Sequence, residues 1–172
     1  MSEGDRRRGS PGSVELYLVR HGHAGDPEAW HGPDDARPLS AKGEGQTVKL
    51  AAFLRRIGVR PRAILTSPRL RASQTAGPIG DALGIEVRAE PLLAPGVDLV
   101  DLERILSAAG DPASLLIVGH DPDFSAMAAE LTGAETLPLP KGAAARIDAN
   151  RPLVPGSGVL RWLVPPDLLP ES

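Results

Sequence analysis

The stretch "LYLVRHGHA", residues 16–24, joins an apolar run to a group of basic side chains. Residues 16–19 predict a buried strand, and Gly22 ends it directly after Arg20 and His21. A cation and an imidazole at the end of a buried strand suit three kinds of site. They bind an anion, attack one, or hold a metal ion. The rest of the sequence has to show which of these three kinds of site is present.

Length and composition predict one soluble globular domain with an aliphatic core. The chain has 172 residues, enough to bury a full core. Hydrophobic residues make up 41% and charged residues 24%, whereas aromatic residues make up only 3%. The net charge of −3 argues against a general nucleic-acid binder, which needs a broad basic surface. The absence of cysteine excludes disulfides and thiolate metal sites.

Neither a membrane span nor a secretory signal is expected from the sequence. No apolar stretch approaches the ~20 residues of a membrane span. Residues 1–13 are charged and lack the apolar segment of a secretory signal. We expect a flexible tail at 1–13, a single domain over 14–172, and a cytoplasmic protein.

Strand and helix patterns alternate along the chain. Strands are expected at 14–19, 63–66, 85–89, 115–118, 143–147 and 159–164. Helices are expected between Ser40 and Gly58, from about Pro68 to Leu83, from Leu99 to near Gly110, and from an Asp121 cap to Gly133. Pro78 should kink or split the second helix, because proline removes a backbone donor. The alternation predicts a three-layer α/β/α sandwich with a mostly parallel central sheet.

Basic side chains follow three of the expected strands. In parallel sheets, sites form at the carboxyl ends of strands, so these groups would converge on one cleft. Guanidinium groups and a helix N-terminus bind phosphate oxygens, and a neutral imidazole can attack phosphorus. The groups are Arg20 and His21 after the first strand, Ser67, Arg69 and Arg71 after the second, and His120 after the fourth.

Three blocks also carry a family resemblance. "LVRHGHA" (18–24), "TSPRLRASQTA" (66–76) and "IVGHDPDF" (117–124) resemble, in that order, the signature blocks of the histidine phosphatase superfamily. The resemblance implies the phosphoglycerate mutase-like fold of that superfamily. The short chain, "RPLSAKGEGQ" (37–46) and the ending "PKGAAARIDA…GVLRWLVPP" (140–166) are similar to SixA-type phosphohistidine phosphatases. The similarity runs from about residue 14 to residue 166.

The resemblance implies a role for four residues. His21 would be the nucleophile and would become transiently phosphorylated. Arg20 and Arg71 would hold the phosphoryl oxygens, and His120 would complete the pocket as a hydrogen-bond donor. Water would then hydrolyse the intermediate, and neither a metal nor a cofactor would be needed.

A proton donor for the leaving group is missing from the expected place. Many relatives that cleave phosphate esters have an acid after the third strand, where this chain reads "RAEPLLAPGVD" (88–98) with Leu92 at the expected position. Glu90 and Asp98 are weak candidates. An alkoxide leaves poorly without a proton, whereas the P–N bond of phosphohistidine is more labile. The missing acid therefore favours phosphohistidine as substrate.

Other polar residues keep two interpretations each. Ser67 either caps its helix or binds phosphate. Arg69 is a substrate contact or a solvated helix residue, and Lys141 reaches the cleft or lies on the surface. His23 and His31 are expected as loop residues at the cleft rim. A metal pair of the His-x-His type is disfavoured, because no further ligand set for it appears in the sequence.

Together these observations predict a metal-independent phosphatase that acts through phospho-His21. Its expected substrate is phosphohistidine in a protein such as a phosphotransfer domain. One alternative is a phosphatase for a small ester, such as a sugar phosphate or a nucleotide-derived phosphate, which would need a hidden acid. Another is a non-catalytic phosphate-binding protein. Neither nucleic acid nor a membrane is expected as a partner.

Overall fold

A six-stranded sheet forms the centre of the molecule in the computed structural model, which describes residues 12–171. Its strand order is β3-β2-β4-β1-β5-β6, in which β3, β2, β4 and β1 are parallel, β5 pairs antiparallel with β1, and β6 pairs antiparallel with β5. The strands are β1 (Ser13–Arg20), β2 (Ala63–Thr66), β3 (Val87–Ala89), β4 (Ser114–Gly119), β5 (Ala144–Asn150) and β6 (Val159–Val164). The expected mostly parallel sheet is confirmed.

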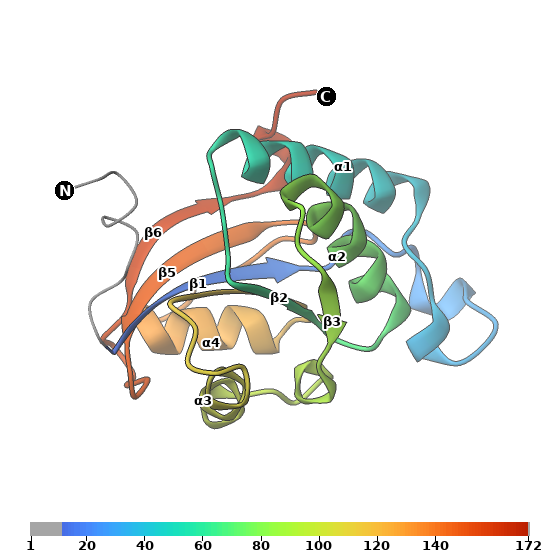
Figure 1. Cartoon of the computed structure of the whole chain (residues 1–172). Helices are drawn as coiled ribbons and strands as arrows, with labels where there is room; N and C mark the ends of the chain where they lie inside the picture. Colours follow the sequence, from blue (N-terminus) through green and yellow to red (C-terminus); the bar gives the residue numbers. More distant parts are fainter. Residues whose placement is uncertain (1–11, 172) are drawn as a thin grey trace.

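Helices cover both faces of this sheet, as a three-layer sandwich requires (Figure 1). One face carries α1 (Ala41–Arg56) and α2 (Leu70–Leu83), and the other carries α3 (Leu99–Ala108) and α4 (Asp123–Thr132). Short 3-10 turns connect them: η2 (Pro27–Ala29), η3 (Asp34–Ala36), η4 (Pro91–Leu93) and η5 (Pro166–Leu168). Within residues 12–171, no helix is both long and apolar enough to cross a membrane.

The core divides into two apolar layers, one on each side of the sheet. Side chains alternate along a strand, so Leu16 and Leu18 pack with α3 and α4, while Tyr17 and Val19 pack with α1 and α2. All six residues of β4 are buried, which explains its unbroken apolar sequence at the centre of the sheet. The two layers hold the carboxyl ends of β1, β2 and β4 in fixed positions.

Some local expectations were wrong. Of the two effects expected at Pro78, a kink or a split, the split is absent, because α2 runs without interruption from Leu70 to Leu83. The apolar face of α2, which includes Ile79 and Leu83, is buried in the core, and this packing outweighs the single backbone hydrogen bond that proline removes. Strand β3 starts at Val87, two residues later than expected.

The ends of two elements also differ from expectation. Helix α4 begins at Asp123 with Pro122 as its N-cap, so Asp121 is not the capping residue. The Asp121 carboxylate instead accepts hydrogen bonds from the backbone and hydroxyl of Ser125, at 3.0 and 2.6 Å. Of the expected tail, residues 1–11 lie outside the described residues, and Ser13 already belongs to β1.

The first turn of α1 packs directly against the loop that follows β1. Ser40 caps this helix as expected, since its hydroxyl accepts a hydrogen bond from the Gly43 amide at 3.1 Å. A Cβ atom on Gly43 would lie only 2.0 Å from the His23 carbonyl oxygen. The loop next to His21 therefore depends on a glycine at this position.

Gly43→Ala is expected to destabilise the protein by about 1–3 kcal/mol, because backbone atoms of the β1 loop would have to move. Gly45→Ala is the matched control, since it changes the same helix turn at a position with nothing within 4 Å. The control should stabilise the protein by ~0.5–1 kcal/mol through helix propensity. Urea unfolding of both variants measures the difference, and equal effects would contradict the packing.

Candidate active site

The polar groups at three strand ends meet at one edge of the sheet. Arg20 and His21 end β1, Ser67 follows β2, and His120 follows β4, the strand that lies between the other two. Arg71 joins them from the first turn of α2. Parallel alignment of these neighbouring strands brings the groups together, as the sequence predicted. His21, Arg71 and His120 are at least nine-tenths buried.

The two histidine rings lie next to each other, with their centroids 5.2 Å apart. The Nδ1 atom of His21 lies 2.8 Å from the Gly22 carbonyl oxygen. A carbonyl oxygen only accepts, so Nδ1 carries the proton and the lone pair of the neutral ring is on Nε2. The Gly22 amide donates to Thr75 Oγ1 at 3.1 Å, which fixes this turn. The geometry therefore leaves Nε2 of His21 available as a nucleophile.

Ser67 holds the second histidine. Its hydroxyl oxygen lies 2.7 Å from His120 Nε2 and accepts a hydrogen bond from the Arg69 amide at 3.3 Å. When the hydroxyl donates to Nε2, the neutral ring of His120 carries its proton on Nδ1. The cap of α2 is Arg69 rather than Ser67. Ser67 thus contacts the ring of His120 through Nε2 and leaves Nδ1 outside this contact.

Both arginines are anchored at one end of the guanidinium group. Nη1 of Arg20 donates to the Leu139 carbonyl at 2.9 Å and lies 3.4 Å from a carboxylate oxygen of Asp121. Arg71 donates from Nη1 to the Asp34 carbonyl at 2.8 Å and from Nη2 to the Asp34 carboxylate at 2.9 Å. The Nε atoms of both arginines are free of these anchors.

Three buried side-chain nitrogens have no partner within residues 12–171: Nε of Arg20 and Nε of Arg71, which are donors, and Nδ1 of His120, which is a donor in one neutral tautomer. No other buried side-chain nitrogen or oxygen in this part of the chain lacks a partner. A buried unsatisfied donor costs about 1–3 kcal/mol, and native proteins retain few of them. All three belong to residues that act on His21: the ring centroid of His120 lies 5.2 Å from that of His21, and the charges of Arg20 and Arg71 lower the His21 pKa.

Burial keeps both imidazoles neutral. It lowers the pKa of His21 to about 4, and the positive charges of Arg71, Arg20 and Lys141 act in the same direction. Burial likewise lowers the pKa of His120 to about 3, assisted by His21 and the arginines. At pH 7 the nucleophilic nitrogen therefore carries its lone pair without help from a general base.

Stability should fall in acid for the same reason. Between pH 6.5 and about 4, an unfolded chain protonates His21 while the folded chain does not, so the free energy of unfolding decreases as pH drops through this window. The loss approaches about 3 kcal/mol at 1.36 kcal/mol per pKa unit. Urea unfolding at pH 7 and pH 4.5 should show a smaller loss for His21→Gln than for wild type. Equal losses would contradict the low pKa.

The two weak candidates for a proton donor both cap short elements. The Glu90 carboxylate accepts from the Leu92 amide at 3.0 Å at the start of η4. Asp98 accepts from the Asp101 amide at 2.9 Å in the capping box of α3. Among the described contacts, neither carboxylate reaches the pocket side chains. Leu92, at the position where an acid was sought, is 39% exposed.

The loop after β1 contributes residues that the sequence analysis missed. Asp34 on η3 contacts Arg71, and Arg37 is buried beside it. In the sequence, Asp34 lies three residues before Arg37, the first residue of "RPLS". The loop has no hydrophobic periodicity, so the sequence does not show what Asp34 contacts. His23 pairs with Ser40 through Nδ1 at 2.6 Å, and His31 is exposed, which agrees with loop positions for both.

The segment 139–142 closes the other side of the pocket. The Gly142 amide donates to the carbonyls of His21 and Arg20, at 3.0 and 3.2 Å. Lys141 precedes it, and its charge lowers the pKa of His21. Of the two interpretations for Lys141, the structure thus favours a position near the cleft. Within residues 12–171 no group of three or more His, Asp or Glu side chains is arranged to hold a metal ion.

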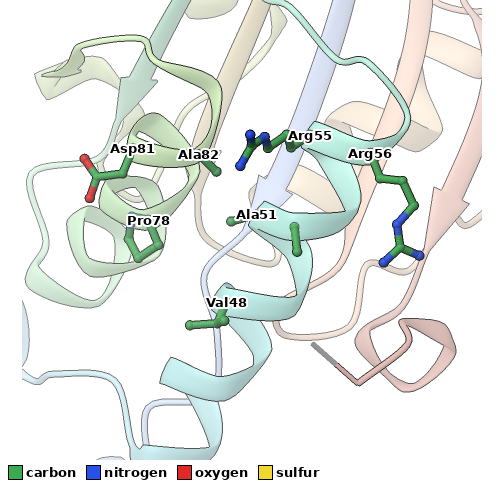
Figure 2. A pocket seen from close by; sticks show the side chains of 8 residues that line it. Val48, Ala51, Arg55, Arg56, Pro78, Asp81 and Ala82 are labelled. Atoms are coloured by element: carbon green, nitrogen blue, oxygen red, sulfur yellow. The ribbon is translucent and has the colours of Figure 1, made fainter.

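A separate groove of about 640 Å³ lies between the outer faces of α1 and α2 (Figure 2). None of the pocket residues contributes to it. It is lined by Val48, Ala51, Ala52, Arg55, Arg56, Pro78, Asp81 and Ala82.

Comparison with known proteins agrees with this site. The family model of the histidine phosphatase superfamily (branch 1) matches residues 16–95, a range that contains Arg20, His21 and Arg71. The chain is 31% identical over 158 residues to the phosphohistidine phosphatase SixA of Escherichia coli K12, covering 89% of this chain and 94% of that protein. It is also 33% identical over 106 residues to an 8-oxo-(d)GTP phosphatase of Mycolicibacterium smegmatis, covering 59% of this chain and 32% of that protein.

Solved structures give the same result for the fold. The protein histidine phosphatase SixA complexed with tungstate superposes with a TM-score of 0.77 at 29% sequence identity, covering 90% of this chain and 98% of that one. Since the similarity to SixA extends over nearly the whole of both chains in sequence and in fold, this chain belongs to the histidine phosphatase superfamily and is a SixA-like histidine phosphatase.

Proposed function

We propose that this phosphatase hydrolyses phosphohistidine on a protein through a covalent phosphohistidine at His21. The observation that carries the proposal is the set of three buried nitrogens without a partner, on residues that act on the neutral imidazole of His21, and we take them as the donors to the phosphoryl group. Arg20, Arg71 and His120 supply these donors, and Nε2 of His21 supplies the lone pair. Positioning and charge neutralisation are the main requirements of phosphoryl transfer, and this pocket provides both.

In the first step, Nε2 of His21 attacks phosphorus while the bond from phosphorus to the substrate nitrogen breaks. The electron pair of that bond returns to the substrate imidazole, which leaves as a neutral ring because its other nitrogen already carries a proton. In the second step, water attacks the phosphorus of phospho-His21, the new P–N bond breaks, and Nε2 recovers its lone pair. Inorganic phosphate leaves with the oxygen of that water. Arg20, Arg71 and His120 hold the phosphoryl oxygens in both steps.

The surroundings of the pocket support phosphohistidine over an ester. Glu90 and Asp98 are engaged in helix caps. The carboxylate nearest to Arg71 is Asp34, whose hydrogen bonds to arginines lower its pKa, so it is a poor proton donor. An imidazole leaves more easily than an unprotonated alkoxide. The similarity to the phosphohistidine phosphatase SixA points to the same substrate class, with a phosphotransfer domain as the expected partner.

The test compares phosphate release from a histidine-phosphorylated phosphotransfer domain with release from a panel of sugar and nucleotide phosphate esters. Chelator is present throughout, and His21→Ala is the control for contaminating phosphatases. Faster release from the phosphoprotein supports the proposal. Faster release from one ester overturns the substrate class but keeps the His21 pocket. Activity that chelator removes and added zinc or manganese restores would contradict metal independence.

A further inference from the structure

The carboxylate of Asp34 contacts the guanidinium groups of three arginines. Its carboxylate accepts from Arg37 Nε at 3.0 Å, from Arg69 Nη1 at 3.0 Å and from Arg71 Nη2 at 2.9 Å. The side chain of Asp34 is still 47% exposed, so one side of it faces solvent. A single carboxylate thus joins three guanidinium groups at the rim of the pocket.

The contact with Arg71 uses one particular edge of the guanidinium group. Nη1 donates to the Asp34 carbonyl and Nη2 to the Asp34 carboxylate, so residue 34 occupies the end edge. A planar guanidinium has a second edge, formed by Nε–H and the other Nη2–H, and this edge also fits an oxyanion. The Nε atom on that second edge of Arg71 is the buried donor without a partner.

The same loop is tied back to the strand that carries the nucleophile. Arg37 is 8% exposed and donates from Nη1 to the Ala24 carbonyl at 2.7 Å, three residues after His21. Asp34 binds Arg37 and Arg71 together, and so connects the loop after β1 with the first turn of α2. This connection sets the position of Arg71 relative to His21.

The negative charge of Asp34 also compensates the positive charges of the three arginines that it contacts. Without a carboxylate at this point, the cations of Arg37, Arg69 and Arg71 would face one another at short range. Of these groups the Arg71 side chain is buried while that of Asp34 is 47% exposed, so removing the carboxylate leaves a buried guanidinium with less compensation. Arg71 would then turn toward other acceptors, including Asp35, whose carboxylate now binds Arg69 Nε at 2.8 Å.

We propose that Asp34 is a positioning residue, which holds the end edge of Arg71 so that its Nε–Nη2 edge faces the phosphoryl group. The inference rests on the proposed function and deepens it, because it assigns how the second phosphate-binding arginine is oriented. Two other roles for Asp34, a competing anion and a proton donor, predict different effects of its substitution. A competing anion would block phosphate, and a proton donor would matter only for poor leaving groups.

The experiment compares Asp34→Asn with Asp35→Asn, the neighbouring acid that contacts Arg69 but not Arg71 and is 75% exposed. Two quantities are measured. One is the Kd for inorganic phosphate by calorimetry, and the other is kcat/KM for p-nitrophenyl phosphate and phenyl phosphate, which differ in leaving group. Asp34→Asn should weaken phosphate binding about tenfold and lower kcat/KM about 10–100-fold for both substrates alike. Asp35→Asn should stay within about twofold.

Each other outcome overturns the proposal. Tighter phosphate binding by Asp34→Asn would identify a competing anion. A loss confined to phenyl phosphate would identify a proton donor, and an unchanged Kd and kcat/KM would show that Arg71 is held without Asp34. If Asp34→Asn does not fold, Asp34→Glu, which keeps the charge but moves it, should raise the Kd in the same direction by a smaller factor, and an unchanged Kd would count against the proposal. The binding arm needs no turnover, so it separates failure of this inference from failure of the proposed function.

Discussion

Replacing His21 with alanine is expected to abolish turnover, lowering kcat by about 10⁴-fold or more. The neighbouring imidazole of His120 has its Nε2 atom in contact with the Ser67 hydroxyl at 2.7 Å, so this nitrogen does not provide a second nucleophile. Inorganic phosphate should still bind, because the Nε–Nη2 edges of Arg20 and Arg71 remain. Phosphate release and a calorimetric Kd measure the two effects separately.

A trapped intermediate makes the same prediction more specific. Acid-sensitive, base-stable phosphate should appear on wild-type protein during rapid turnover and be absent from His21→Ala. His31→Ala is the matched control, since His31 is exposed and lies in the loop beyond the pocket. Turnover by His21→Ala within tenfold of wild type would mean that another group attacks phosphorus, and the covalent mechanism would be wrong.

Arg71→Lys is expected to lower kcat/KM by about 10²–10³-fold although it keeps the positive charge. Lysine is a point charge without the two-nitrogen edge that binds two phosphoryl oxygens, and it also cannot hold Asp34 at its other end. The loss should appear in KM, because the bound substrate loses a two-nitrogen contact, and in kcat, because that contact is stronger in the transition state, where the phosphoryl group is being transferred.

Arg104→Lys is the control for this substitution. Arg104 is on α3 with a side chain that is 69% exposed, and its recorded ion pair is with Asp101 in its own helix. The activity of the Arg104→Lys variant should equal that of the wild type. If Arg71→Lys retained activity within about threefold, charge alone would suffice at this position, and the argument from the guanidinium edge would be wrong.

The sequence predicted most of the fold because the relevant patterns are local. "AILT" at 63–66 became β2 with the expected bounds, and the fully apolar run at 115–118 became the central part of β4. Alternation in β1 placed Leu16 and Tyr17 on opposite faces, as the period of a strand requires. The local patterns failed at Pro78, where tertiary packing outweighs the preference of a single residue.

The candidate pocket was predictable for a related reason. Arg20, His21 and His120 directly follow strands whose direction the alternating pattern implies, and the parallel arrangement then brings them to one edge. The order of the three sequence blocks added the family and the roles that the resemblance implies. No such pattern marked Asp34, because its loop contains short 3-10 turns and has no regular repeat.

By itself, then, the sequence determined the α/β class, the order of the strands along the chain and the four residues of the candidate phosphate pocket. Only the tertiary structure decided how those residues are held. The partner of His120 Nε2 is Ser67, 53 residues away, and the partner of Arg71 is Asp34, 37 residues away. The physical reason is that periodicity reports which face of an element is buried, whereas contacts between distant residues depend on the path of the loops and on how the layers pack.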